Sequence, residues 1–296
     1  MFSQQGSLSK QMQPTLGYFF EALSNYERTG QEPVISKVVV DSREALPGSL
    51  FVALRGEQVD GAEYIADAFQ RGAIAALAEW IPEGLGVAAV NIAAEGEKAI
   101  DQWDGSLPVI IVVDDSVEAM QKAATLWRSQ FDVQVIGITG SVGKSSTKEM
   151  THAVLSQRFN TFKSPGNRNS ILGLPAAIFD LRPEHEQAVL EMGMYTVGEI
   201  EKLCQMTQPK IGVVTIIGPV HMERAGSMEK IVAAKQELVE ALPEDGTAIL
   251  NYDDPRVMAM AEHTQAKVFT YGLDRNADVW ADRIHSMGLN LSLIHI

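Results

Sequence analysis

Short apolar runs alternate with helical patterns along most of this 296-residue chain. In its first part, five runs have the length of buried strands, at residues 38–40, 50–54, 75–78, 87–92 and 109–113. The spacing of Ile65, Ala68 and Phe69 predicts a helix over 60–72, and a weaker amphipathic pattern covers 16–23. The segment 93–108 is rich in Glu, Asp and Gly, and we expect it to be a loop or a small insertion.

The second part repeats this alternation with longer helices. Apolar runs of strand length occupy 133–138, 188–191, 211–217, 248–250 and 268–271. Helical patterns lie between them at 145–155, 197–206, 227–242 and 255–263. Strands that alternate with helices of this length indicate βαβ units and a parallel sheet. The pattern therefore predicts an α/β protein, with a small N-terminal α/β domain (1–115) and a doubly wound, mostly parallel sheet domain (116–285).

Composition and charge exclude several classes of protein. The apolar and charged fractions, 46% and 21%, are those of a globular chain. No apolar run approaches the roughly 18 residues of a membrane helix, and the first thirty residues lack the apolar core of a secretory signal. The single cysteine, Cys204, forms no intramolecular disulfide. The net charge of −14 argues against a nucleic-acid partner. We expect a soluble, cytoplasmic protein that does not insert into a membrane.

The sharpest motif is a glycine-rich turn after the strand at 133–138. It reads Gly140-Ser141-Val142-Gly143-Lys144-Ser145-Ser146 and leads into a helical pattern. Such a turn exposes backbone N–H groups to a phosphate, while the lysine supplies positive charge and the next hydroxyl can bind Mg²⁺. Ile138 stands where the strict phosphate-loop pattern has its first glycine, so a simple helix-capping turn is the alternative. The position between strand and helix favours a nucleotide site.

Polar residues also follow three later strands of the predicted sheet. Glu191 could be a magnesium ligand or an ordinary strand-end carboxylate in water. His221 could be a site residue or a surface residue, and Asn251 could serve only as a turn former. Ligands of open α/β sheets bind beyond the carboxyl ends of the strands, where these residues are expected to lie.

Lys235 lies on the apolar face of its predicted helix. It is four residues after Ile231 and three before Leu238, both of which define that face. One interpretation is a lysine whose ammonium reaches water from the edge of the apolar stripe. The other is a lysine in a binding pocket. Periodicity alone does not distinguish them.

Together these motifs resemble the Mur ligase family over most of the chain. The matching stretches are Asp41-Ser42-Arg43, 47–56, Asp60-Gly61, 139–149, 165–169, 190–194, 218–221 and Ala234-Lys235. The forms Thr147-Lys148-Glu149 and Glu191-Met192-Gly193-Met194 are most similar to the members that add a D-alanyl-D-alanine dipeptide.

The resemblance implies an ATP-dependent ligase of peptidoglycan precursor synthesis. In that chemistry ATP and Mg²⁺ convert the terminal carboxylate of a UDP-MurNAc-tripeptide into an acyl phosphate, which the amine of D-Ala-D-Ala then attacks. The small molecules are the expected partners, and we expect a monomer. The N-terminal domain would bind the UDP-linked substrate, and the second domain would bind ATP.

The resemblance also assigns roles to individual residues. It implies that ATP is bound by Gly140, Ser141, Gly143, Lys144, Ser145, Ser146 and Asn251. It implies that Mg²⁺ is bound by Ser145, Glu191, His221 and Lys235. Lys235 would bind the ion as a carbamate, which supplies an anionic oxygen. Substrate binding falls to Asp41, Ser42, Arg43, Asn167 and Asn169. The expected catalytic residues are Lys144, Lys235, His221 and Glu191.

The chain departs from the family pattern in three respects. Ile216 stands where the family usually has Asn, and Ala62 stands where a His is common. The family also has a third, C-terminal domain, which the length of 296 residues does not accommodate. We therefore expect a chain truncated before that domain, with a non-native tail at 286–296 and no ligation activity by itself.

Three other functions remain to be compared with this one. The first is another ligase of the superfamily, of the MurE type or a folylpolyglutamate synthase; the Asp41-Ser42-Arg43 motif favours the UDP-muramyl substrate over folate. The second is a regulatory P-loop GTPase or binding module, but guanine recognition commonly uses Asn-Lys-x-Asp and no Asn of this chain is followed by Lys. The third is an inert nucleotide-binding fragment.

Overall fold

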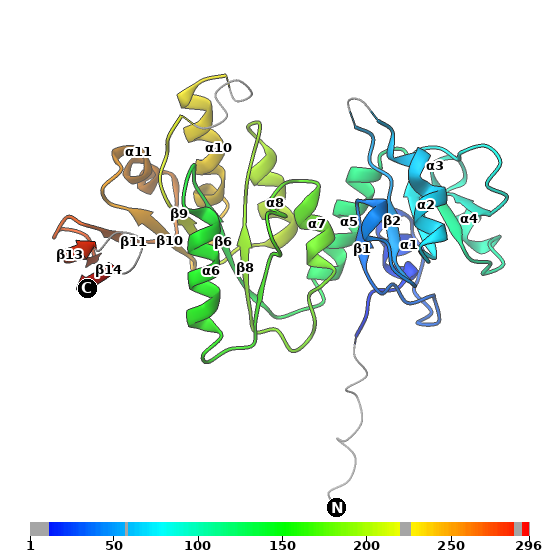
Figure 1. Ribbon diagram of the computed structural model, residues 1–296, viewed down its shortest axis with the longest axis horizontal. Coiled ribbons are helices and arrows are strands. Elements are labelled where there is room, and N and C mark those ends of the chain that lie inside the picture. The colour runs from blue at the N-terminus through cyan, green and yellow to red at the C-terminus, as the bar shows by residue number, and fades with distance from the viewer. Residues whose placement is uncertain (1–11, 57–58, 220–225, 287–291, 296) are drawn as a thin grey trace, which may run out of the picture. The chain divides into compact units, whose positions relative to one another are not determined.

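The computed structural model describes residues 12–56, 59–219, 226–286 and 292–295 (Figure 1). The chain divides into two compact units. The first comprises Met1–Asp132 and Leu172–His185, and the second comprises Val133–Ile171 and Glu186–Ile296. Among the described residues, no helix combines the length and the apolar character that crossing a membrane requires.

The first unit is built on a five-stranded parallel sheet with the order β1-β2-β3-β5-β4. Its strands are β1 (Val38–Val39), β2 (Leu50–Val52), β3 (Ala75–Ala78), β4 (Ala88–Asn91) and β5 (Val109–Val112). All five predicted strands are confirmed, because a parallel sheet is buried on both faces and its strands are therefore nearly continuous apolar runs. One face forms a core in which Val39, Phe51 and Ile110 pack with Ile65 and Ala68 of helix α2 (Ile65–Gln70).

Helices surround this sheet, and some of them differ from the prediction. The confirmed ones are α1 (Leu16–Leu23) and α2, which follows a 3₁₀ turn (Gly61–Tyr64); a further 3₁₀ turn spans Ser42–Glu44. Of the two expectations for 93–108, a plain loop is wrong in part, because two short helices, α3 (Ile92–Glu95) and α4 (Glu97–Asp101), occupy the start of the segment. The Asn91 side chain caps α3 by accepting from the N–H of Ala94, and Ala99 and Ile100 bury their side chains.

The boundaries of the two units differ from the predicted domains 1–115 and 116–285, because two further helices belong to the first unit. Helix α5 (Ser116–Arg128) belongs to the first unit, where Trp127 is fully buried and meets Tyr18 edge to face at 4.8 Å between ring centroids. Helix α7 (Gly173–Ile178) also belongs there, and the neighbouring Phe179 stacks on Phe19 at 5.2 Å. Aromatic packing between distant segments, rather than local pattern, decides both assignments.

The second unit contains a seven-stranded parallel sheet with the order β12-β11-β10-β9-β6-β8-β7. Its strands are β6 (Gln134–Thr139), β7 (Thr161–Lys163), β8 (Gln187–Glu191), β9 (Ile211–Val214), β10 (Thr247–Asn251), β11 (Lys267–Gly272) and β12 (Val279–Trp280). A separate antiparallel pair joins β13 (Asp282–Ser286) to β14 (Ser292–His295). The five predicted strands are confirmed, whereas the short edge strands β7 and β12 were not predicted.

Helices cover both faces of this sheet, as the doubly wound prediction requires (Figure 1). They are α6 (Lys144–Leu155), α8 (Glu199–Thr207), α10 (Met228–Glu240) and α11 (Pro255–Met258), followed by a 3₁₀ turn (Ala259–His263). Ile136 and Ile138 of β6 pack with Leu155 of α6. Gly137 lies on the opposite face, where a Cβ atom would come within 2.9 Å of Leu238 of α10.

The strand order reverses at β6, which has β8 on one side and β9 on the other. In open α/β sheets this reversal opens a crevice at the carboxyl ends of the strands, and ligands bind in it. The loop after β6 is the predicted phosphate loop. The fold therefore puts the strongest sequence motif at the place where such sheets bind ligands.

Candidate functional site

The phosphate loop joins β6 to α6 through two glycines that no other residue could replace without strain. Gly143 precedes the helix with φ +90°, in the left-handed region. Gly140 has φ +142°, and a Cβ atom there would lie 1.9 Å from the Thr215 hydroxyl oxygen. The loop therefore directs backbone N–H groups at the start of a twelve-residue helix, an arrangement that suits an anion.

Lys144 folds back over this loop. Its ammonium donates hydrogen bonds to the carbonyl oxygens of Gly140 at 2.9 Å and Ser141 at 3.3 Å. Burial lowers the pKa of Lys144, and the Glu191 carboxylate partly opposes that shift. The lysine thus holds its charge at the loop, where it can meet a bound phosphate.

Glu191 ends β8 and is only 2% exposed, so the interpretation of a strand-end carboxylate in water is wrong. One carboxylate oxygen accepts from the Ser145 hydroxyl at 2.9 Å, and the other accepts from the Asn169 amide at 2.8 Å. Its backbone N–H donates to the Ser164 hydroxyl at 3.1 Å. The carboxylate is therefore fixed beside the first turn of α6.

Lys235 is 4% exposed and lines the pocket beside the phosphate loop, so it does not reach water from the edge of its helix. Burial lowers its pKa to about 8, and the positive charge of Lys144 adds to the effect. The pocket encloses about 200 Å³. Its lining comprises Gly140, Ser141, Lys144, Asn167, Asn169, Ser170, Gly193, Met194, Tyr195, Ile231 and Lys235.

The loop after β9 is tied to the phosphate loop. The Thr215 hydroxyl donates to the Val142 carbonyl at 2.6 Å. The Ser141 hydroxyl both donates to the Gly218 carbonyl at 3.0 Å and accepts from the Gly218 N–H at 2.9 Å. This loop leads toward His221, a predicted site residue that lies outside the described residues.

Asn251 and Ser146 have other surroundings. Asn251 ends β10 and donates from its amide to the Thr215 carbonyl at 2.8 Å, while its amide oxygen accepts from the N–H of Asp253. It therefore forms the turn that the sequence suggested and is not among the residues that line the pocket. Ser146 is exposed on the first turn of α6.

The two departures from the family pattern leave the loops intact. The backbone carbonyl of Ile216 accepts from the N–H of Ser141 at 2.7 Å, a contact that any residue could make. Ala62 is buried, and its N–H donates to the side chain of Asp60.

The predicted substrate residues of the first unit line a pocket of their own. Asp41, Ser42 and Arg43 contribute to a cavity of about 760 Å³ beside Phe51 and Tyr64. The Arg43 guanidinium donates three hydrogen bonds to the Asp41 carboxylate, at 2.9, 3.1 and 2.6 Å. The Arg43 guanidinium lowers the pKa of the Asp41 carboxyl. The motif thus forms a charged edge of an otherwise largely apolar cavity.

Sequence reasoning did not single out two residues of this site. Lys148, one turn after Lys144 on α6, is buried and lies 3.6 Å from Glu191. The spacing of four residues from Lys144 was a usable signal, since it places both lysines on one side of the helix. Thr215 gave no such signal, because only the tertiary approach of β9 brings it to the glycines.

Comparison with protein families matches both parts of the chain. Residues 138–295 match the Mur ligase middle domain, and residues 34–128 match the model described as Mur ligase family, catalytic domain. The middle-domain match alone spans more than half of the 296 residues.

Several curated relatives are named UDP-N-acetylmuramoyl-tripeptide–D-alanyl-D-alanine ligase. The one from Synechocystis sp. is 38% identical over 241 residues, which is 81% of this chain and 49% of the relative. The one from Bacillus subtilis is 36% identical over 259 residues, or 86% of this chain and 50% of the relative. The chain spans about half the length of the curated relatives it matches.

Solved structures agree with these relatives. MurF from Acinetobacter baumannii matches with a TM-score of 0.74 and 27% identity, covering 93% of this chain and 56% of that one. MurF from Thermotoga maritima, solved in complex with ADP, matches with a TM-score of 0.69 and 29% identity, covering 84% of this chain and 53% of that one. From its two domain matches and the site described above, this chain belongs to the Mur ligase family.

Proposed function

We propose that this chain carries the nucleotide- and substrate-binding parts of an ATP-dependent ligase that joins D-alanyl-D-alanine to a UDP-MurNAc-tripeptide. The observation that carries the proposal is the arrangement at the phosphate loop. There Lys144 and Lys235 line one pocket, and the Ser145–Glu191 pair lies at the first turn of α6. The choice of dipeptide and tripeptide rests on the names of the relatives.

ATP would bind with its phosphates against the loop. The backbone N–H groups at the start of α6 and the Lys144 ammonium together neutralise phosphate charge. The ADP complex of the Thermotoga maritima relative supports an adenine nucleotide as the ligand. We propose Asn251 as the adenine contact, although its amide is engaged by the Thr215 carbonyl in this structure.

The residues beside the loop fit a magnesium ion. The Ser145 hydroxyl and one Glu191 oxygen lie 2.9 Å apart, so both could bind one cation, and oxygen ligands of this kind suit Mg²⁺. Bound Mg²⁺ would offset the charge of the β- and γ-phosphates. His221 remains a proposed ligand. Among the described residues, no three His, Cys, Asp or Glu side chains form a metal cluster. Ser145 and Glu191 would supply only part of the octahedral ligand set of Mg²⁺, which leaves room for a further anionic oxygen ligand.

We propose that Lys235 supplies this ligand as a carbamate. The reaction requires a neutral amine, whose nitrogen attacks CO₂ and loses a proton. Burial lowers the pKa of Lys235 to about 8, so a much larger share of the amine is neutral near pH 7 than for an exposed lysine. A carbamate would replace a positive charge beside Lys144 with a negative one. Carbon-13 NMR of protein equilibrated with labelled bicarbonate tests this directly: a carbamate signal that Lys235→Met abolishes supports it.

The chemistry would need no nucleophilic side chain. A carboxylate oxygen of the tripeptide attacks the γ-phosphorus, the bond to the β-phosphate oxygen breaks, and ADP leaves. The dipeptide amine then attacks the acyl carbon, phosphate leaves and the nitrogen loses a proton. Lys144 would stabilise transferred negative charge, and carbamylated Lys235 would act through the Mg²⁺ that it helps to hold. Asn167 and Asn169 would position the substrate, since such transfers depend on positioning and electrostatics.

A thermal-shift screen tests the proposal against its alternatives. Ligands that bind only the folded state raise its melting temperature. We expect ATP with Mg²⁺ and the UDP-MurNAc-tripeptide each to raise Tm, whereas GTP and folates leave it unchanged. A rise with folate instead would indicate a folylpolyglutamate synthase, and a flat response to every ligand would indicate an inert fragment. Either result contradicts the proposal.

A further inference from the structure

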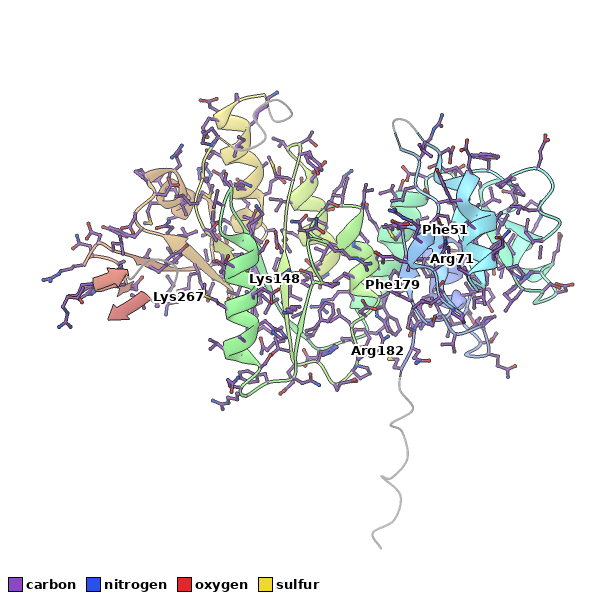
Figure 2. All side chains as sticks on the ribbon, in the orientation of Figure 1. Phe51, Arg71, Lys148, Phe179, Arg182 and Lys267 are labelled. Carbon is purple, nitrogen blue, oxygen red and sulfur yellow. The ribbon has the colours of Figure 1, made fainter. Side chains whose placement is uncertain are left out.

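Lys148 is a buried lysine to which neither the fold nor the proposed reaction yet gives a role. It lies in the middle of α6, where Figure 2 labels it, and is 1% exposed. Within the part of the chain that the structure describes, it is the only charged residue among the largest fully buried side chains. Burying an ammonium is costly unless it is paired and hydrogen-bonded, so its partners indicate why it is there.

The Lys148 ammonium joins three segments of the second unit. It donates to the carbonyl of Gly166 at 2.6 Å and lies 3.6 Å from one oxygen of Glu191 and 3.6 Å from one of Glu149. The first contact is a hydrogen bond, and the two longer ones are ion pairs. Gly166 belongs to the loop after β7, the same loop that carries Asn167 and Asn169.

The Glu191 oxygen that faces Lys148 is the one that accepts from Ser145. The other oxygen accepts from Asn169, whose backbone N–H and carbonyl also hold the loop in place. Lys148 therefore affects the position of the Glu191 carboxylate in two ways. It places a positive charge beside the buried carboxylate, and it anchors the loop that holds the carboxylate from its other side.

We propose that Lys148 is a positioning residue, which fixes Glu191 and the 164–170 loop against α6 so that the proposed magnesium ligand and the proposed substrate asparagines are held together. The inference rests on the proposed function for the role of Glu191. Lys144 and Lys148 lie on one side of α6 and have different roles in this proposal. Lys144 would contact the nucleotide, whereas Lys148 would position Glu191 and the 164–170 loop.

The test compares Lys148→Met with Lys210→Met in the complete chain. Methionine keeps the length and apolar stem of the side chain and removes its charge. Lys210 is a surface lysine, 45% exposed and paired with Asp245, so its variant controls for the loss of a lysine in the same unit. Circular dichroism and urea unfolding first establish that both variants fold. If Lys148→Met does not fold, Lys148→Gln replaces it, since Gln keeps an N–H donor for Gly166 without the charge.

The main readout is the gain in ADP affinity that Mg²⁺ produces, measured by calorimetry with and without the ion. We expect Lys148→Met to reduce this gain about tenfold, because Glu191 loses the ammonium that holds its carboxylate in place, while ADP affinity without Mg²⁺ stays close to the wild type. We expect Lys210→Met to behave as the wild type. A folded Lys148 variant that keeps the full gain from Mg²⁺ overturns the proposal.

Hydrogen exchange separates this inference from the proposed function. In the absence of any ligand, backbone amides of 164–170 should exchange about tenfold faster in Lys148→Met than in the wild type. If the wild type binds no ADP, the proposed function fails. Faster exchange in Lys148→Met would still support the inference that Lys148 anchors the 164–170 loop. Unchanged exchange in that case overturns the inference as well.

Discussion

Replacement of Lys235 by methionine should make the protein more stable at neutral pH. The Lys235 side chain is 4% exposed, and its pKa is lowered from 10.5 to about 8 by burial and by the charge of Lys144. At pH 7 the amine is protonated in both the folded and the unfolded state, so folding buries a charge. A methionine of similar length would fill the same space without that cost.

The magnitude follows from the pKa difference. A shift from 10.5 to about 8 corresponds to about 3 kcal/mol of free energy at pH 7. Between pH 8 and pH 10.5 the folded state has released the proton while the unfolded state still holds it, so the stability of the wild type rises with pH in that window. The advantage of Lys235→Met should therefore fall from about 3 kcal/mol at pH 7 to less than about 1 kcal/mol at pH 10.

Urea unfolding followed by circular dichroism, in buffers free of CO₂, measures this advantage from pH 7 to pH 10. Excluding CO₂ keeps Lys235 as an amine, so that carbamate formation does not contribute. Lys210→Met serves as the control for the loss of a lysine from the surface of the same unit, because Lys210 is 45% exposed. A Lys235→Met protein that is less stable than the wild type at pH 7, or whose advantage does not change with pH, would refute the reasoning.

Four further outcomes are expected. Lys144→Ala should lower ADP affinity in calorimetry about tenfold, since a charge-assisted phosphate contact contributes about 1.5–3 kcal/mol; unchanged affinity would remove the nucleotide assignment. Gly140→Ala should lower the free energy of unfolding by about 1–3 kcal/mol, because its φ is +142° and its Cβ would meet Thr215; a stable variant would show that the loop adapts. Phe179→Ala should cost about 3–5 kcal/mol in urea unfolding, as it is a fully buried aromatic residue, and a loss under 1 kcal/mol, on the order of a surface substitution, would contradict its place in the core. Burial raises the pKa of Cys204 to about 12, so its thiol should stay unreactive toward a disulfide reagent at pH 8 until urea unfolds the protein; rapid labelling of the folded chain would contradict this.

The sequence was most informative about the sheets. Strands buried on both faces must be apolar throughout, so the runs at 109–113 and 133–138 could be recognised without knowledge of their neighbours. The phosphate loop was equally local, because its glycines are required by their own backbone angles. Edge strand β7 escaped prediction, because all three of its residues are only half-buried and carry no apolar run.

The site residues were harder to predict where their state depends on distant segments. Periodicity placed Lys235 on the inner face of α10, but only packing beside Lys144 decides that its ammonium is buried rather than in water. Lys148 was missed for the related reason that a lysine in the middle of a helix is usually exposed. Its burial depends on Gly166 and Glu191, which approach from two other segments.

The assignment of α7 to the first unit has a consequence for how the chain folds during synthesis. When the ribosome has made residues 1–132, the unit still lacks α7 and Phe179, so Phe19 has no stacking partner. The chain then enters β6, α6 and β7 before it returns to supply them. The nascent first unit therefore has an incomplete core while the first strands of the second are already leaving the ribosome. A fragment that ends at residue 132 should accordingly be aggregation-prone. A fragment that extends to residue 185 contains α7 and Phe179 and can therefore complete the core of the first unit.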